Sequence, residues 1–185
     1  RHTRSLCDWS SDVCSSDLNP ATSYTITGFA AGESQATALT GAAAVSHAAV
    51  QSSPVGSYPI RVTRGTLAAN DGNYVFKTFT DGALKVITTP GAPTRVVGIA
   101  GSRSVTLSWK PPVNRGNSAV TDYQIQYRVT TSTAWAYFTD AVSSTPSTVV
   151  TGLLPGKSYV FRVLARNAAG TGAVSASSAA VTPRA

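Results

Sequence analysis

The chain has 185 residues and a formal net charge of +7, and 42% of its residues are hydrophobic. This length suffices for one large or two ordinary domains, each with a packed core. No apolar run reaches the roughly 20 residues of a transmembrane helix, so no membrane span is expected. Charged residues make up only 12%, and serine, threonine, alanine and glycine are abundant, which favours β-structure with many turns over salt-bridged helices. Because methionine is absent, we expect a piece of a longer open reading frame.

The first segment, Arg1–Leu18, shows no steady periodicity and contains both cysteines. Written back into codons, Asp8–Leu18 resembles a common short-read sequencing adapter. We therefore interpret residues 1–18 as a non-native, disordered, translated adapter and exclude them from fold reasoning. On this interpretation Cys7 and Cys14 form neither a natural disulfide nor half of a metal site. The alternative is a disordered secreted linker.

Residues 19–90 predict short strands separated by turns. The stretch SYTITGF (23–29) alternates as a strand that ends at Gly28. Residues 36–53 are alanine-rich, but Gly41 interrupts them and no wide apolar stripe recurs at helical spacing, so strands are expected there. In the strand YPIRVTRG, Pro59 predicts an edge position or a first ladder position.

A hairpin is expected at Asn70–Asn73, because asparagine and glycine tolerate positive φ. The stretches YVFKTF and ALKVIT flank the next turn, at Asp81 and Gly82. Four motifs occur in a fixed order along this part of the chain: YTITGF, SSPVGSYPIRV, GTLAANDGNYVF and DGALKVI.

Together these four motifs resemble the MBG-type repeat domain of large bacterial surface proteins. The resemblance implies a small all-β repeat, usually in tandem, that extends a surface protein and helps it adhere. The first strand of such repeats begins several residues before the Asn19-Pro20 step. We therefore expect a truncated domain over 19–90 with one unpaired edge, for which residues 1–18 supply no proper partner strand.

Thr88–Pro93 is predicted to be a short, stiff, proline-containing linker. After it, residues 91–185 have the length of a typical sandwich domain. Alternation at a period of two predicts strands at Val105–Trp109, Tyr123–Arg128, Trp135–Phe138, Thr148–Thr151, Tyr159–Arg166 and Gly172–Val181. Tyr159 begins its strand after a turn, in the position from which a tyrosine corner reaches back to upstream backbone.

The motifs of this second part resemble a fibronectin type III domain. They are Val105-x-Leu107-x-Trp109, Pro111-Pro112, Tyr123-x-Ile125-x-Tyr127, Leu153-x-Pro155-Gly156-x-x-Tyr159-x-Phe161 and Asn167-x-x-Gly170. The resemblance covers residues 92–183 and implies a seven-stranded, immunoglobulin-like β-sandwich without disulfides that serves as a spacer or binding module. The predicted fold class is therefore all-β, with two small β-sandwich-like domains in tandem.

Several aromatic and aliphatic residues are assigned to the core of that sandwich rather than to a ligand site. They are Trp109, Tyr123, Tyr127, Leu153, Tyr159 and Phe161.

No set of residues predicts catalysis, a cofactor or a metal. His47 is the only histidine after residue 18, and five carboxylates are scattered between Glu33 and Asp140. A metal cage and a Ser-His-Asp triad each need several groups that converge on one point. The loop Asn114–Asn117 contains no RGD tripeptide and is expected to be solvated. The chain is therefore predicted not to be an enzyme.

Charge is the remaining signal. Residues 91–185 contain nine basic and two acidic residues, against four and three in residues 19–90. If the strands around residues 125 and 163 pair, a flat, basic, amide-rich face forms from Gln124, Gln126, Arg128, Arg162 and Arg166. Such a face attracts anionic glycans, acidic cell-wall polymers or a membrane surface. The alternative is a solvated face whose charges oppose edge aggregation, and nucleic acid is not expected because exposed aromatics for base stacking are lacking.

The predicted function is that of a non-catalytic structural or adhesion fragment of a larger secreted or cell-surface bacterial protein. Each domain is a monomeric bead of a spacer stalk, and repetition strengthens weak contacts by raising effective concentration. The alternative is a set of accessory modules of a secreted polysaccharide-degrading enzyme whose catalytic domain lies outside this fragment.

Overall fold

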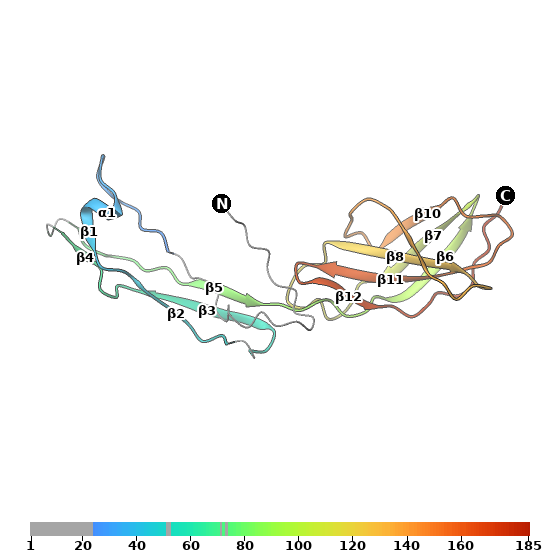
Figure 1. Ribbon diagram of the computed structural model, residues 1–185, viewed down its shortest axis with the longest axis horizontal. Coiled ribbons are helices and arrows are strands. Elements are labelled where there is room, and N and C mark those ends of the chain that lie inside the picture. The colour runs from blue at the N-terminus through green and yellow to red at the C-terminus, as the bar shows by residue number, and fades with distance from the viewer. Residues whose placement is uncertain (1–23, 51–52, 71, 73) are drawn as a thin grey trace. The chain divides into compact units, whose positions relative to one another are not determined.

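The computed structural model describes residues 24–50, 53–70, 72 and 74–185. These residues form two compact units, 24–86 and 87–185 (Figure 1). Within them almost all regular structure is β-strand, and the helix α1 has only four residues. The predicted all-β fold class is therefore confirmed. The predicted adapter segment lies outside the described residues.

The first unit contains two antiparallel sheets. The larger has the order β2-β3-β5, formed by Ala44–His47, Gly56–Thr63 and Gly82–Val86. The smaller pairs β1 (Leu39–Thr40) with β4 (Ala68–Ala69). Three buried residues, Ala38, Leu39 and Leu67, form its core cluster, against which half-buried aromatic residues pack.

Pro59 does not lie in an edge strand or at a first ladder position, because β3 is the central strand of its sheet. The pairing explains how the sheet tolerates it. Strand β2 pairs only with residues 60–63 of β3, whereas β5 pairs with residues 56–60. At Pro59, opposite Ala83, the ladder has one partner strand, so the missing N–H removes no bond to β2.

The expectation of strands throughout residues 36–53 is wrong at its start, where α1 (Gln35–Ala38) forms one helical turn. Ser34 caps this turn. Its N–H donates to Thr37 Oγ1 at 2.9 Å, and its carbonyl accepts from the Ala38 N–H at 2.9 Å. A capping pair of hydroxyl residues three apart thus decides the local structure.

The stretches 24–29 and 74–79 also belong to no strand in the described part of the chain, contrary to expectation. Their aromatic rings pack instead. The Phe29 and Tyr74 rings meet edge-on at 5.9 Å, and the Phe76 and Phe79 rings stack at 6.5 Å. The predicted hairpin at Asn70–Asn73 falls partly outside the described residues.

The second unit is a seven-stranded antiparallel sandwich, as predicted. One sheet has the order β10-β7-β6 and the other β12-β11-β8-β9. The strands are β6 (Thr94–Gly101), β7 (Ser104–Lys110), β8 (Asp122–Val129), β9 (Ala136–Phe138), β10 (Ser147–Thr151), β11 (Tyr159–Asn167) and β12 (Gly170–Val174). In Figure 1, β8 and β11 lie side by side in yellow and orange.

Alternating residues of both sheets face one continuous core. β11 buries Phe161, Val163 and Ala165 completely, and β7 buries Val105 and Leu107. Burying a side chain of the size of phenylalanine contributes about 1.5–3 kcal/mol, so the buried side chains of these two strands contribute substantially to the stability of the unit.

Tyr159 makes the predicted corner. The Leu154 N–H donates to Tyr159 Oη at 3.1 Å, five residues upstream of the ring. The Tyr159 backbone pairs in both directions with Val181, at 2.8 and 2.9 Å. The corner thus joins the turn before β11 to the last segment of the chain.

Beyond Val174 the last segment binds β11 through serine side chains, whereas a single strand was expected over 172–181. The Val163 N–H donates to Ser175 Oγ at 2.9 Å, and the Phe161 N–H donates to Ser178 Oγ at 3.1 Å. Both serines also donate their own N–H to β11 carbonyls. The hydroxyls therefore replace backbone acceptors that a regular ladder would provide.

Residues 88–93, here called the strap, are bound to the second unit. The Thr88 N–H donates to the Gly116 carbonyl at 3.0 Å, and the Gly91 N–H donates to the Asn114 carbonyl at 2.9 Å. Asn167 Nδ2 donates to the carbonyls of Thr88 and Arg115, both at 2.8 Å. The segment expected as a short, stiff linker is thus bound to this unit.

A basic and aromatic face as candidate functional site

The pairing of β8 with β11 decides which side chains share the outer face. Gln126 lies opposite Arg162, Gln124 opposite Leu164, and Arg128 opposite Val160. Opposed residues of an antiparallel pair point to the same side, and their neighbours along the strand point into the core. The structure therefore places all five residues of the predicted basic face, including Arg166, on the outer side of one sheet.

Four residues at the middle of this face form a compact group, here called the Arg–Trp cluster: Gln126, Arg128, Trp135 and Arg162. The guanidinium carbon of Arg162 lies 4.1 Å from the centroid of the Trp135 ring, and that of Arg128 lies 5.0 Å from it. Both are within the range of cation–π attraction.

Hydrogen bonds fix the two guanidinium groups further. Arg162 Nε donates to Gln126 Oε1 at 2.5 Å. Arg128 Nη1 donates to the Ser132 carbonyl, also at 2.5 Å. Because stacking and hydrogen bonding act on the same side chains, the two cations lose less freedom on binding an anion than free surface arginines would.

Tyr137 extends the face onto β9. It lies opposite Gln126, which lies opposite Arg162, so the three side chains form a row across three strands. Neighbouring strands are about 4.8 Å apart, so the row spans about 10 Å. Tyr137 is 62% exposed. The expectation that this face lacks exposed aromatics is therefore wrong.

The signal for Tyr137 was present in the sequence, since residues 135–138 read WAYF. Residues two apart share a face, so Trp135 and Tyr137 lie outward while Phe138 packs against the core. With three aromatic residues among four, the pattern alone does not say which pair faces outward.

One end of the face has a carboxylate in its register. Asp122 lies opposite Arg166, and its Oδ1 accepts a hydrogen bond from the Ser143 N–H at 3.1 Å. The other carboxylate of this unit, Asp140, accepts a hydrogen bond from the Thr148 hydroxyl at 3.1 Å. In the register of β8 and β11, Arg128 and Arg162 are thus opposed by uncharged residues, whereas Arg166 is opposed by a carboxylate.

The sequence of this unit matches a known family. Residues 91–181 match the fibronectin type III domain, and residues 11–85 match the MBG domain of the YGX type. Residues 91–181 are a fibronectin type III domain. An MBG domain precedes it in the chain. The order predicted from the motifs is therefore confirmed.

Several curated proteins are similar to parts of this chain. Identity is 33% over 88 residues with Protein turtle of Drosophila melanogaster, covering 48% of this chain and 6% of that protein. It is 38% over 117 residues with human Myosin-binding protein H-like, covering 62% and 30%. It is 38% over 93 residues with mouse Ephrin type-A receptor 8, covering 48% and 9%. The chain thus spans less than a third of each relative.

A crystal structure of titin domains is similar with a TM-score of 0.54 and 26% identity, over 71% of this chain and 41% of that one. It supports the immunoglobulin-like sandwich. Fibronectin type III domains are typically non-catalytic modules of larger chains. The relatives named above are animal proteins, so they carry no argument for a bacterial source.

The residues assigned to the core lie inside the fibronectin type III domain. Trp109, Tyr123, Leu153, Tyr159 and Phe161 are buried. Trp109 and Tyr123 meet edge-on at 5.1 Å. Burial raises the pKa of the Tyr123 hydroxyl, and the Trp109 indole and the Arg115 charge offset only part of that rise.

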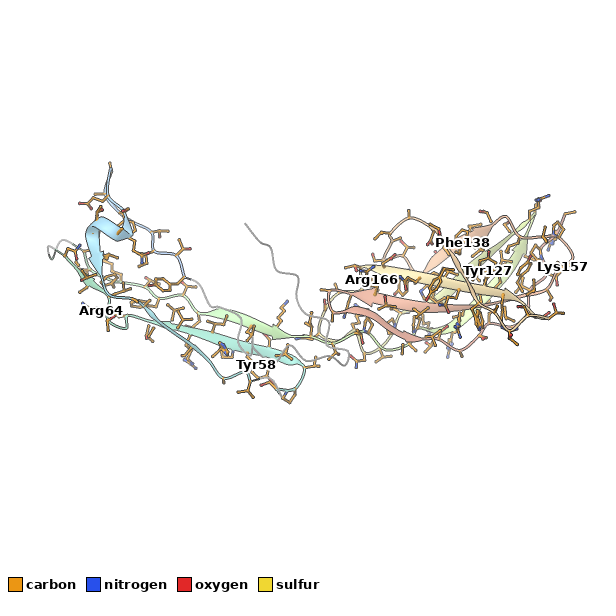
Figure 2. The ribbon with its side chains drawn as sticks, in the orientation of Figure 1. Tyr58, Arg64, Tyr127, Phe138, Lys157 and Arg166 are labelled. Carbon is orange, nitrogen blue, oxygen red and sulfur yellow. The ribbon has the colours of Figure 1, made fainter. Side chains whose placement is uncertain are left out.

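Tyr127 is half-buried, and its ring lies 6.2 Å from that of Tyr159. Figure 2 shows Tyr127 and Phe138 within the sandwich, with Arg166 and Lys157 toward its opposite ends. None of these aromatic core residues reaches the Arg–Trp cluster through a described contact, so they support the sheet beneath the face rather than the face itself.

The loop Asn114–Asn117 of the fibronectin type III domain holds the strap. Asn114 Oδ1 accepts from the Gly116 N–H at 2.9 Å, and Gly116 has φ +68°. A Cβ at Gly116 would collide with the Thr88 carbonyl. The loop was expected to be solvated. Asn114, Arg115 and Asn117 are exposed, but Gly116 is buried.

Among the described residues, no three histidine, cysteine, aspartate or glutamate side chains converge to hold a metal ion. The His47 ring lies 3.1 Å from the Ala49 carbonyl through Nδ1. In the same part of the chain, no helix has the length and apolar character needed to span a membrane.

Proposed function

We propose that this chain is part of the stalk of a larger secreted or cell-surface bacterial protein and adheres weakly to anionic polymers. Both matched domains are of module type, and the order of the MBG motifs supports the bacterial surface setting. The adhesive part is the basic face of the fibronectin type III domain: Gln124, Gln126, Arg128, Arg162 and Arg166. Anionic glycans and acidic cell-wall polymers are its partners.

One observation carries the proposal. Two guanidinium groups, on Arg128 and Arg162, are held over one indole ring on an exposed sheet face, and the nearest opposed carboxylate faces Arg166 instead. A solvated face needs no such ordering. A fixed pair of cations attracts an anionic surface, and the attraction weakens with salt.

Weak contacts suffice for this role. Modules in tandem raise the local concentration of every copy after the first has bound, so each face contributes without a deep pocket. A flat sheet face suits an extended polymer.

The test is retention on immobilised heparin and on isolated bacterial cell walls in a salt gradient. Arg128, Arg162 and Arg166 are changed together to serine, and Arg103, Lys110 and Arg184 are changed together as a control of equal charge. We expect the face variant to elute at clearly lower salt than the control. Equal elution of the two variants would reduce the effect to net charge and contradict the proposal.

A further inference from the structure

We propose that the outer face of β8, β9 and β11 is a binding site for a linear acidic polysaccharide. In this site the Tyr137 ring stacks on one sugar, and Arg128 and Arg162 pair with the carboxylate or sulfate of a neighbouring one. This inference rests on the proposed function for the negative charge of the ligand. It adds that the ligand is a sugar polymer, that Tyr137 stacks on it, and that Tyr137, Arg128 and Arg162 bind neighbouring sugars.

The row Tyr137, Gln126 and Arg162 supplies two kinds of contact that such a ligand needs. An aromatic ring packs against the C–H face of a pyranose, and a guanidinium pairs with an anion. Gln126 is only 6% exposed; it lies between the two and orients Arg162 through its Oε1. Consecutive register pairs place them in line across the sheet. The row is about 10 Å long, a span that a disaccharide bridges.

The guanidinium groups retain donors for a ligand. Arg162 uses Nε for Gln126, and Arg128 uses Nη1 for backbone carbonyls that include that of Ser132. A guanidinium has five N–H donors, so each arginine keeps an edge that matches a carboxylate or sulfate. Trp135 acts as a positioning residue, because its ring holds both cations.

Tyr137 distinguishes this ligand from other polyanions. Trp135 is covered by the two guanidinium groups, which leaves Tyr137 as the open aromatic platform of the face. Single-stranded nucleic acid is bound through several successive platforms, and an anionic membrane needs no stacking residue. One platform beside two cations fits a sugar polymer with one charge per repeating unit.

The experiment titrates the full 185-residue chain with polygalacturonate, with its carboxyl-reduced neutral form and with dextran sulfate, by calorimetry at low salt. Three variants are compared with the parent chain: Tyr137→Ala, Tyr137→Phe and Arg162→Gln. Tyr137 is exposed, so its two variants should unfold at the temperature of the parent chain. Arg162→Gln also removes the bond to buried Gln126, so thermal unfolding sets the temperature at which every variant is folded and binding is compared.

For the polymer that binds, we expect Arg162→Gln to weaken binding about tenfold or more, since a charge-assisted hydrogen bond is lost. Tyr137→Ala should weaken it about fivefold, whereas Tyr137→Phe, which keeps the ring, should stay within about twofold. The neutral polymer should not bind. Preference between polygalacturonate and dextran sulfate identifies the anionic group and supports the site in either case.

Two outcomes overturn the inference and separate it from the proposed function. If Arg162→Gln weakens binding but Tyr137→Ala does not, the face binds polyanions through its charge alone and does not recognise sugars. In that case only the proposed function stands. If no acidic polymer binds at all, both fail. Tighter binding of oligo-dT or of phosphatidylglycerol vesicles than of either polysaccharide also overturns it.

Discussion

The two units use the same kind of strand but close their cores differently. In the first unit, β3 alternates between half-buried and exposed residues, and none of its side chains is fully buried. In the second, β11 alternates between fully buried and outward-facing residues along most of its length. A strand that faces a second sheet excludes water from one side, whereas a less covered sheet shields its apolar side only in part. This difference predicts a larger free energy of unfolding for the second unit than for the first.

The largest effect is expected from Phe161→Ala. Removing a completely buried ring from the sandwich should lower the free energy of unfolding of the second unit by about 3–5 kcal/mol. Val160→Ala, on the outward side of the same strand, is the matched control, with a loss of about 1 kcal/mol or less. Calorimetry should show one transition moving down while the other stays. Equal movement of both transitions would mean that the units do not unfold separately.

Leu67→Ala tests the smaller core. Leu67 is 2% exposed in a cluster with only two other buried residues. The expected loss is about 2–3 kcal/mol, which is a large share of the stability of a unit with so little buried surface. Hydrogen exchange should therefore become fast throughout residues 24–86. Val75→Ala, at a highly exposed position, should change nothing, and an equal effect of the two would refute this account of the core.

Asn167→Ala tests how the strap is held to the second unit. It removes the two donors that hold the carbonyls of Thr88 and Arg115, with an expected loss of about 2 kcal/mol. The Thr88 and Gly91 amides should exchange faster. Asn167→Asp keeps the acceptor for the Ala169 N–H but faces the two carbonyls with a carboxylate, so it should loosen the strap equally. Unchanged exchange in both variants would show that the strap is held without Asn167.

The smallest effect is at alkaline pH. Burial holds the pKa of Tyr123 above its ordinary value of 10.0. The folded domain keeps this proton where the unfolded chain loses it, so the free energy of unfolding falls as the pH rises above about 10. Denaturant midpoints of the second unit at pH 8 and just above pH 10 measure the fall. Tyr123→Phe should reduce it, and an identical fall in both proteins would contradict the assignment.

The success of sequence reasoning also differs between the units. In β11 the apolar and polar residues have opposite environments, so their alternation predicts both the strand and the residues that face outward. In the first unit the short elements depend on single contacts, such as the Ser34 and Thr37 cap, which outweigh the alternation around them. Pro59 was placed correctly in a strand but not in the sheet, because pairing that ends one residue away leaves no trace in the sequence.

The candidate site was predictable in its charged part only. Gln126, Arg128 and Arg162 follow from two strands with opposite faces, once those strands pair. The contribution of Tyr137 and Trp135 depends on which neighbour β8 takes on its other side, and a run of aromatic residues does not specify that. The contact between Asn167 and Thr88 joins residues 79 positions apart, so proline content alone predicted a stiff linker but not its attachment to the domain.

The serine contacts of the last segment have a consequence for chains with many such modules. A regular final strand would present an open row of N–H and C=O groups, and neighbouring copies on one polypeptide would exchange strands through it. After Val174 the segment instead follows an irregular path secured by Ser175 and Ser178. It completes its own domain and, beyond Val174, presents less regular backbone for strand pairing than a continued strand would.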